Sequence, residues 1–309
     1  MLIGPNGSGK TFALKGLYSA IKAIEQCGRG KEPRTLKELL SDSLYWTFQV
    51  DTLGEIVRKG DPSLTFSMKS AAGETLSYSF SPAATKVAQV EENTFRPTEV
   101  NSIFIPAKEV ASLQDVILRS HDIDKAFGFD KTYVDLARAL SKATQGKNYK
   151  EFADARKSLS DAVGGRLEYD EAKGEWIFRD RNRRTFSVNA TSEGFKRLAI
   201  LDALLGNRYL TNNSTIFIDE AEANLHPTMI RTFMEILVLL AKAGCQIFLS
   251  THSYFVIKNL YILAQKEKMS IATYSFAEGC ATRSDLLEEM PDNPIVQESI
   301  DLYMREMAL

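Results

Sequence analysis

Cysteine and histidine are scarce in this chain of 309 residues, which has three of each. The cysteines lie far apart and form no CxxC pair, so they indicate reduced thiols of a cytoplasmic protein rather than a disulfide framework. They are Cys27, Cys245 and Cys280. The histidines are equally dispersed, which argues against a zinc cage.

Long hydrophobic runs and an excess of one charge are missing too. The most apolar helical stretch, residues 229–241, contains Arg231 and Glu235 and is too short to span a bilayer. The first residues are rich in glycine and do not read as a signal peptide. The chain has 38 Lys and Arg against 40 Asp and Glu, which argues against a protein whose whole surface binds nucleic acid. We therefore expect no membrane partner and, at most, a local basic patch.

A phosphate loop is present near the amino terminus. The octapeptide GPNGSGKT, residues 4–11, matches the pattern GxxxxGK[ST], and an apolar face predicts a helix from residue 10 to about residue 27. The glycines allow backbone N–H groups to point at phosphate oxygens. Lys10 would contact the β- and γ-phosphates, and the Thr11 hydroxyl would bind Mg²⁺. The predicted nucleotide-binding residues are Asn6, Gly7, Ser8, Gly9, Lys10 and Thr11.

Only Met1, Leu2 and Ile3 precede this loop, about half the usual length of a strand. An edge strand, an aromatic platform for adenine, or both are therefore expected to be missing. Either the protein starts upstream or this version is shortened, and we expect ATP hydrolysis to be weakened.

A buried strand that ends in two carboxylates follows much later in the chain. The run TIFIDE, residues 215–220, is apolar until Asp219 and Glu220, as in a central parallel strand. Asp219 would hold Mg²⁺, and Glu220 would polarise the attacking water. The long separation from the phosphate loop leaves room for an inserted region.

Two further segments supply candidate site residues. The run QIFLSTHS, residues 246–253, predicts a parallel strand with His252 just past its end, where it would reach the γ-phosphate. The run TSEGFKRL, residues 191–198, predicts a helix that begins with Ser192 and Gly194. A hydroxyl and free N–H groups at a helix start suit a γ-phosphate, although Ser192 is also an ordinary helix cap.

In this order, the segments GPNGSGKT, TSEGFKRL, IFIDEAEANLHP and FLSTHS resemble ABC-type P-loop ATPases of the soluble RecF/SMC/OLD-like branch. The resemblance covers roughly residues 1–25 and 186–265. It implies an α/β core, mostly a parallel sheet flanked by helices, with an adjacent antiparallel β region and a helical insert. It also implies two subunits that sandwich ATP and Mg²⁺ head to tail. Ser192 and Gly194 would then act in trans, with Asn224 in the loop that links the two sites.

The chain departs from the family pattern at two places. Phe195 stands where the signature usually has glutamine. The glutamine-loop residue is either Glu109, after the predicted strand 102–106, or Gln49, after the apolar run 44–48.

We expect three parts. Residues 1–108 would form the first half of the ATPase core with an antiparallel β region, residues 109–165 a helical insert, and residues 166–309 the second half of the core. The insert lacks the heptads of a long coiled coil. A hairpin with a turn at residues 172–174 precedes a basic group that could face a dimer interface, a second nucleotide, nucleic acid or solvent. This group consists of Arg179, Arg181, Arg183 and Arg184.

These features predict an ATP-hydrolysing switch that dimerises and controls a partner, either a protein effector or nucleic acid. By resemblance, the effector could belong to a prokaryotic anti-phage cassette. The alternatives are a nucleotide-binding scaffold with little hydrolysis and a RecF-like DNA-repair ATPase. The signature and the helical insert argue against a transporter ATPase.

Overall fold

A computed structural model describes residues 1–29, 33–87, 89–96, 100–143, 149–170, 175–277 and 279–309. The turn predicted at residues 172–174 lies outside these ranges.

A mostly parallel sheet forms the centre of the molecule. Within the described residues it has six strands in the order β12-β11-β1-β10-β9-β5, and β12 alone runs antiparallel to its neighbour. Its strands are β1 (Leu2–Ile3), β5 (Ile103–Ile105), β9 (Thr215–Ile218), β10 (Gln246–Thr251), β11 (Ala272–Ala277) and β12 (Cys280–Asp285). The predicted α/β class is confirmed.

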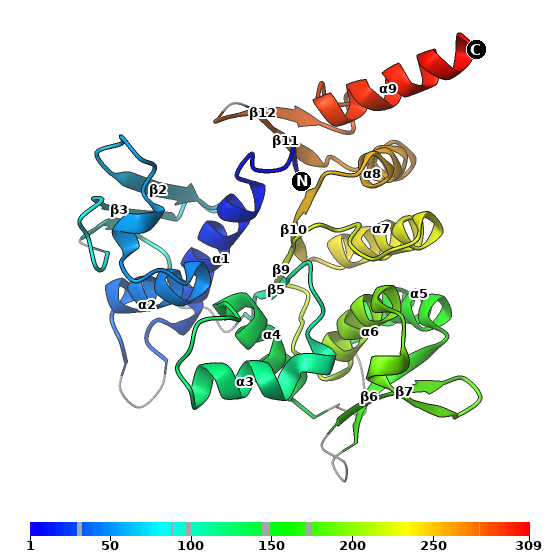
Figure 1. Ribbon diagram of the computed structural model, residues 1–309, viewed down its shortest axis with the longest axis horizontal. Coiled ribbons are helices and arrows are strands. Elements are labelled where there is room, and N and C mark those ends of the chain that lie inside the picture. Colours follow the sequence, from blue (N-terminus) through cyan, green and yellow to red (C-terminus); the bar gives the residue numbers. More distant parts are fainter. Residues whose placement is uncertain (30–32, 88, 97–99, 144–148, 171–174, 278) are drawn as a thin grey trace.

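Helices cover both faces of this sheet (Figure 1). The helices α1 and α2 lie on one side, and α7 and α8 lie on the other. The described helices are α1 (Lys10–Gln26), α2 (Leu36–Phe48), α3 (Gln114–Asp122), α4 (Lys131–Leu140), α5 (Ala153–Val163), α6 (Glu193–Gly206), α7 (Pro227–Lys242), α8 (Tyr254–Glu267) and α9 (Pro294–Met307). Short 3₁₀ turns are η1 (Leu53–Ile56), η2 (Ala111–Leu113), η3 (Lys150–Phe152) and η4 (Val188–Ala190).

The buried strand β9 explains why both faces are covered. Its side chains alternate between faces, so apolar residues at every position require a hydrophobic layer on each side. Phe217 packs with Leu14 and Tyr18 of α1. Ile216 and Ile218 join the larger core on the opposite face. This packing fixes the height at which β9 ends and Asp219 begins.

Two small antiparallel sheets lie beside the core. One contains β2 (Leu64–Lys69), β3 (Thr75–Phe80) and β4 (Gln89–Asn93), and the other contains β6 (Gly165–Asp170), β7 (Glu175–Asp180) and β8 (Thr185–Ser187). The apolar run 44–48 belongs to helix α2, whose start is fixed by a reciprocal capping box between Thr35 and Glu38. Gln49 therefore follows a helix.

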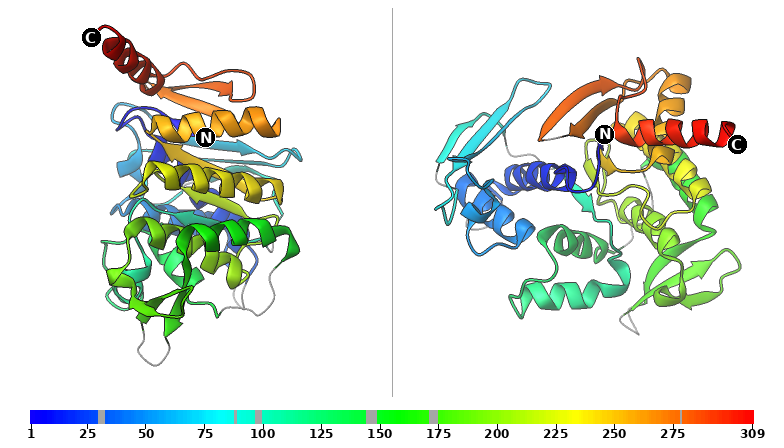
Figure 2. Two further views of the ribbon diagram at one scale, coloured as in Figure 1. Left: turned by 90° about the vertical axis from the view of Figure 1, so that its right-hand side faces the viewer. Right: turned by 45° about the horizontal axis from the view of Figure 1, so that its top comes forward.

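The carboxyl-terminal helix α9 extends away from the rest of the molecule (Figure 2). Of its residues, Val296 is buried, whereas Tyr303 and Met307 are exposed. None of the described helices is long and apolar enough to cross a membrane. The division of the chain at residues 108 and 165 stays a prediction.

Candidate functional site

The phosphate loop, Asp219 and His252 all follow parallel strands of the central sheet. The loop follows β1, His252 follows β10, and Asp219 follows β9. These strands are consecutive neighbours in the sheet. Because they are parallel, their carboxyl ends meet at one edge, which is where ligands bind in α/β sheets.

A chain of hydrogen bonds joins the loop to the ends of β9 and β10. The Thr11 hydroxyl donates to both carboxylate oxygens of Asp219, at 2.9 and 3.1 Å. Ser250 Oγ donates to Asp219 Oδ1 at 2.6 Å and accepts from the backbone N–H of Glu220 at 2.9 Å. Asp219 is only 8% exposed. The two residues predicted to hold Mg²⁺ are therefore in direct contact.

Lys10 is folded back onto its own loop. Its Nζ donates to the carbonyl oxygens of Gly4 and Pro5, each at 2.8 Å. Burial lowers the pKa of Lys10, while the carboxylates of Asp219 and Glu220 act in the opposite direction. The ammonium group of Lys10 is thus held at the loop by two backbone acceptors.

The start of helix α1 depends on a glycine. Gly9 caps the helix with a φ of 97°, in the left-handed region where side chains are strained, and it offers no side chain to cap the helix. The N–H groups of the first helical turn have no acceptor within the helix. They remain available to an anion at this end.

Glu220 and Asn224 both have positive φ angles, 47° and 59°. For a residue other than glycine this conformation costs free energy and concentrates at functional sites. Glu220 is half-buried and follows Asp219 directly, and its role toward water stays a prediction. Asparagine adopts this conformation more readily than most residues, because its short amide side chain can form local hydrogen bonds.

Glu222, which the sequence analysis did not select, holds His252 in place. Its carboxylate accepts from Thr251 Oγ1 at 2.7 Å and from the backbone N–H of His252 at 2.8 Å. His252 Nδ1 lies 3.2 Å from the same carboxylate. The ring is therefore anchored from the loop after β9, and its Nε2 is left for another contact.

The signature residues lie at the start of α6. Ser192 is exposed and caps the helix, accepting from the N–H of Phe195 at 3.4 Å. Gly194 is buried against the loop after β9. The approach is close, since a Cβ atom added at this position would lie 2.7 Å from the carbonyl oxygen of Asn224. The signature residue Gly194 and the loop residue Asn224 thus lie side by side within one chain.

Arg197, on the same helix, is another residue that the sequence analysis did not select. Its guanidinium donates to the carbonyl oxygen of Asp219 at 2.6 Å, and it is 6% exposed. Burial lowers its pKa to about 10, against the opposing effect of Glu222 and Asp219, so it stays charged at neutral pH. Arg197 therefore ties α6 to the end of β9. Arg197, Glu222 and Ser250 lie inside the motif segments, but nothing in the sequence gives their contacts across the sheet.

The two candidates for the glutamine-loop residue lie in different parts of the fold. Glu109 lies in the loop after β5, and its carboxylate accepts from the N–H of Ser112 at 2.9 Å. Gln49 caps the end of α2, and its side-chain nitrogen is buried without a hydrogen-bond partner. The topology favours Glu109, whose strand adjoins β9. The identity of the residue stays a prediction.

Most of the basic group on the hairpin is paired with acids of the same chain. Arg179 contacts Glu168 at 2.7 Å, Arg181 contacts Asp161 at 2.6 Å, and Arg184 contacts Asp180 at 2.7 Å. This pattern suits a hairpin edge that is stabilised by ion pairs. Exposed pairs of this kind contribute little to the free energy of unfolding.

The oxygen atoms at the site fit a magnesium ion. Mg²⁺ prefers hard oxygen ligands and often takes one or two protein groups beside phosphate and water. The Thr11 hydroxyl and the Asp219 carboxylate are such ligands and already touch. Among the residues that the structure describes, no group of three or more His, Cys, Asp or Glu side chains could hold a metal by itself.

A family model with the description "AAA domain, putative AbiEii toxin, Type IV TA system" (AAA_21) matches residues 1–258. The chain belongs to this AAA family. Family membership, together with the motif order, confirms the resemblance to P-loop ATPases of the AAA family. No curated protein matches the chain.

Several solved structures are similar to this AAA chain. The SMC head domain from Thermotoga maritima is 13% identical, with 92% of this chain and 88% of that chain covered and a TM-score of 0.41. An SmcHead bound to the C-winged helix domain of ScpA has the same identity and coverage and a TM-score of 0.49. The ATP-binding cassette MJ1267 of an ABC transporter is 13% identical over 97% and 86%, with a TM-score of 0.38.

Proposed function

We propose that the chain binds and hydrolyses ATP with Mg²⁺, and that nucleotide closes a head-to-tail dimer which controls a partner protein. The observation that carries this proposal is the hydrogen-bonded chain from Thr11 through Asp219 and Ser250 to the backbone of Glu220. It joins the phosphate loop to the carboxyl ends of β9 and β10, which supports a nucleotide site at this edge of the sheet.

In this proposal each residue of the site has a separate role. Lys10 leaves the carbonyls of Gly4 and Pro5 and binds the β- and γ-phosphates. Thr11 and Asp219 would hold Mg²⁺, which would supply positive charge beside the phosphates. Glu220 orients and polarises water, and His252, held by Glu222, contacts the γ-phosphate.

A second subunit is proposed because the signature lies to one side of the phosphate loop. Gly194 packs on the loop after β9, and β10 separates β9 from β1. Two strand spacings amount to about 10 Å. The exposed Ser192 would therefore reach the nucleotide of a second copy more readily than its own. The family description, which names a toxin system, supports a protein effector as the partner, for instance an anti-phage effector.

The test is Glu220→Gln, with the exposed Glu235→Gln as a control for the same chemical change. We expect Glu220→Gln to lower ATP turnover by about 10² or more while ATP binding is kept. Light scattering on a sizing column should then show a dimer with Mg-ATP and a monomer without it. Unchanged turnover would remove Glu220 as the residue that activates water. Binding without phosphate release in the unaltered protein would favour the scaffold instead.

A further inference from the structure

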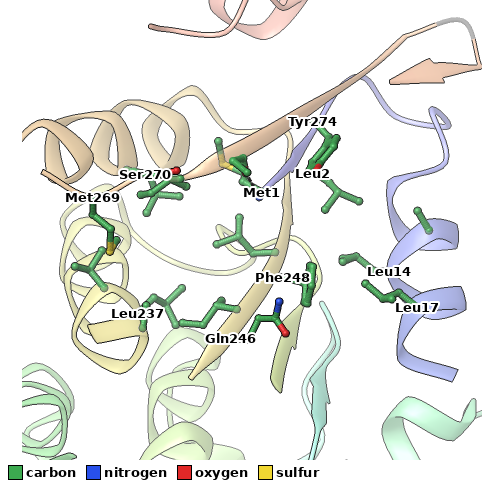
Figure 3. A pocket seen from close by; sticks show the side chains of 18 of the residues that line it. Met1, Leu2, Leu14, Leu17, Leu237, Gln246, Phe248, Met269, Ser270 and Tyr274 are labelled. Atoms are coloured by element: carbon green, nitrogen blue, oxygen red, sulfur yellow. Dashed lines mark hydrogen bonds between the residues drawn. The ribbon is translucent and has the colours of Figure 1, made fainter. Parts of the chain in front are cut away.

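Two hollows of the molecule differ in chemistry. One is lined mostly by apolar side chains, among them Leu14, Phe248 and Leu237 (Figure 3). The other has a volume of about 520 Å³, and its lining residues belong to α5, α6, β6, β7 and the turn after β7. Of the ten described residues that line it, six are basic and two are acidic. The basic residues of this second hollow, called the basic hollow below, are Arg156, Lys157, Arg166, Arg179, Arg181 and Arg183.

The pairing of β6 with β7 brings two like charges together at the basic hollow. Arg166 and Arg179 lie directly opposite each other in this antiparallel pair, where two like charges destabilise a sheet. Glu168 accepts from the Nε of both guanidinium groups, at 2.5 and 2.7 Å. One carboxylate therefore serves two cations, and this wall of the hollow keeps an excess of positive charge.

Two further cations of the basic hollow lack an acidic partner. Lys157 and Arg183 are exposed, and neither forms an ion pair or a side-chain hydrogen bond with another residue that the structure describes. The backbone N–H of Arg183 donates to the carbonyl oxygen of Asp180 at 3.0 Å, which fixes Arg183 in a tight turn beside the hollow. The repulsion among the basic residues is therefore only partly compensated within the described chain.

The ion pairs that do form leave donors for a further acceptor. A guanidinium group has five N–H donors. Arg156 uses Nε and Nη2 for the carboxylate of Asp202, at 2.7 and 3.2 Å, and Arg181 uses Nη2 for Asp161 at 2.6 Å. The side chains of Arg181 and Asp161 are more than half exposed, so their pair contributes little free energy and an incoming anion can replace it.

The arrangement of the cations favours a compact ligand. Surfaces that bind nucleic acid typically carry their basic residues in an extended patch or stripe. Here the basic residues come from separate elements and line one hollow, whose volume is in the range of sites for small molecules. Arginine binds phosphate through two parallel N–H donors, so phosphate groups suit a hollow with five arginines.

We propose that the basic hollow binds a compact anion with several phosphate groups, at a site separate from the phosphate loop. Phosphate oxygens would accept from Arg166, Arg179 and Arg183 and would offset the repulsion among them. Arg156 also holds Asp202 of the signature helix α6, so the bound anion would lie one ion pair away from that helix. The binding itself does not depend on the proposed ATPase activity.

The test titrates inositol hexakisphosphate, a compact polyphosphate, into the full chain in a calorimeter. We expect saturable binding of one probe per chain. The double variant Lys157→Ala and Arg183→Ala should raise Kd about tenfold or more, since hydrogen bonds to charged groups are strong. The double variant Lys37→Ala and Arg231→Ala removes two exposed cations elsewhere and should leave Kd unchanged. Circular dichroism checks that both double variants are folded.

A second arm of the test looks for a gain in affinity. Asp161→Asn removes a carboxylate that competes for Arg181, so it should lower Kd about two- to fivefold. Asp292→Asn, an exposed change of the same kind outside the basic hollow, should leave Kd unchanged. A gain of the same size in both variants would show a general effect of net charge and would overturn the assignment to this hollow.

Other results would also overturn the proposal. Absence of binding, or an unchanged Kd in the double variant Lys157→Ala and Arg183→Ala, would exclude the basic hollow as the site. We expect Lys10→Ala to bind the probe like the unaltered chain, and loss of binding would instead place the probe in the phosphate loop. Tighter binding of a single-stranded oligonucleotide, weakened by the same double variant, would make the hollow part of a nucleic-acid surface. Because no arm measures ATP hydrolysis, failure here is distinguishable from failure of the proposed ATPase.

Discussion

At the scale of single residues, the site is organised by acidic side chains that hold other groups in place. Asp219 accepts from Thr11 and Ser250, and Glu222 accepts from Thr251 and from the backbone of His252. Each carboxylate thereby connects the ends of neighbouring strands. Hydrogen bonds to charged acceptors are the stronger ones, so these two residues fix the geometry of the edge.

Glu222 provides the residue-scale prediction. We expect Glu222→Ala to lower kcat for ATP by about 10- to 100-fold with little change in KM, because loss of an orienting partner typically costs that much. Glu222→Gln keeps an acceptor for Thr251 and for the His252 N–H and should recover most of the rate. Steady-state phosphate release at varied ATP measures both constants. Equal loss in the two variants would show that the charge matters rather than the orientation.

Much of this edge could be predicted from sequence, and particular residues show where prediction stopped. Asp219 and His252 were identified because parallel strands bring their carboxyl ends together, whatever the register. Arg197 and Ser250 were missed because their roles depend on contacts across strands and helices. The sequence does not tell which element residues 44–48 form either. They belong to helix α2, but a short apolar run has no periodicity that distinguishes a strand from a helix.

At the scale of elements, the start of α6 is fitted to the loop after β9. The fit depends on the missing Cβ of Gly194, which allows the carbonyl of Asn224 to approach. Arg197, one turn further on, bonds the carbonyl of Asp219. A shift of α6 is therefore coupled to the end of β9, and the two elements should move together.

The element-scale prediction compares two glycine-to-alanine changes. Gly194→Ala should lower the free energy of unfolding by about 1–3 kcal/mol, because the new methyl group overpacks the Asn224 carbonyl. Gly16→Ala lies within α1, where nothing is within 4 Å of a Cβ, and should raise the free energy of unfolding by about 0.5–1 kcal/mol. Urea unfolding followed by circular dichroism measures both. A stabilising Gly194→Ala would contradict the close approach.

At the scale of the whole molecule, the phosphate loop follows β1, whereas the signature helix α6 packs on the loop after β9, and β10 lies between these two strands. In the proposed function, a single chain carries the two halves of a nucleotide site without joining them. Two chains related by a two-fold axis would join them twice, since such an interface is self-complementary.

The whole-molecule prediction uses two variants that should each be inactive, Lys10→Ala and Ser192→Arg. In an equal mixture, half of the dimers are mixed and each mixed dimer has one intact composite site, so about a quarter of the original turnover should return. Phosphate release by each variant alone and by the mixture provides the measurement. No recovery on mixing would mean that Ser192 acts within its own chain.

The folded-back lysine has a consequence for the way in which the loop would take up an anion. Lys10 Nζ donates to two backbone carbonyl oxygens of its own loop. An ammonium group that already has acceptors gains less free energy from a new partner than one that has none. In the proposed function, ATP binding is therefore an exchange of partners for Lys10, in which phosphate oxygens replace two carbonyls.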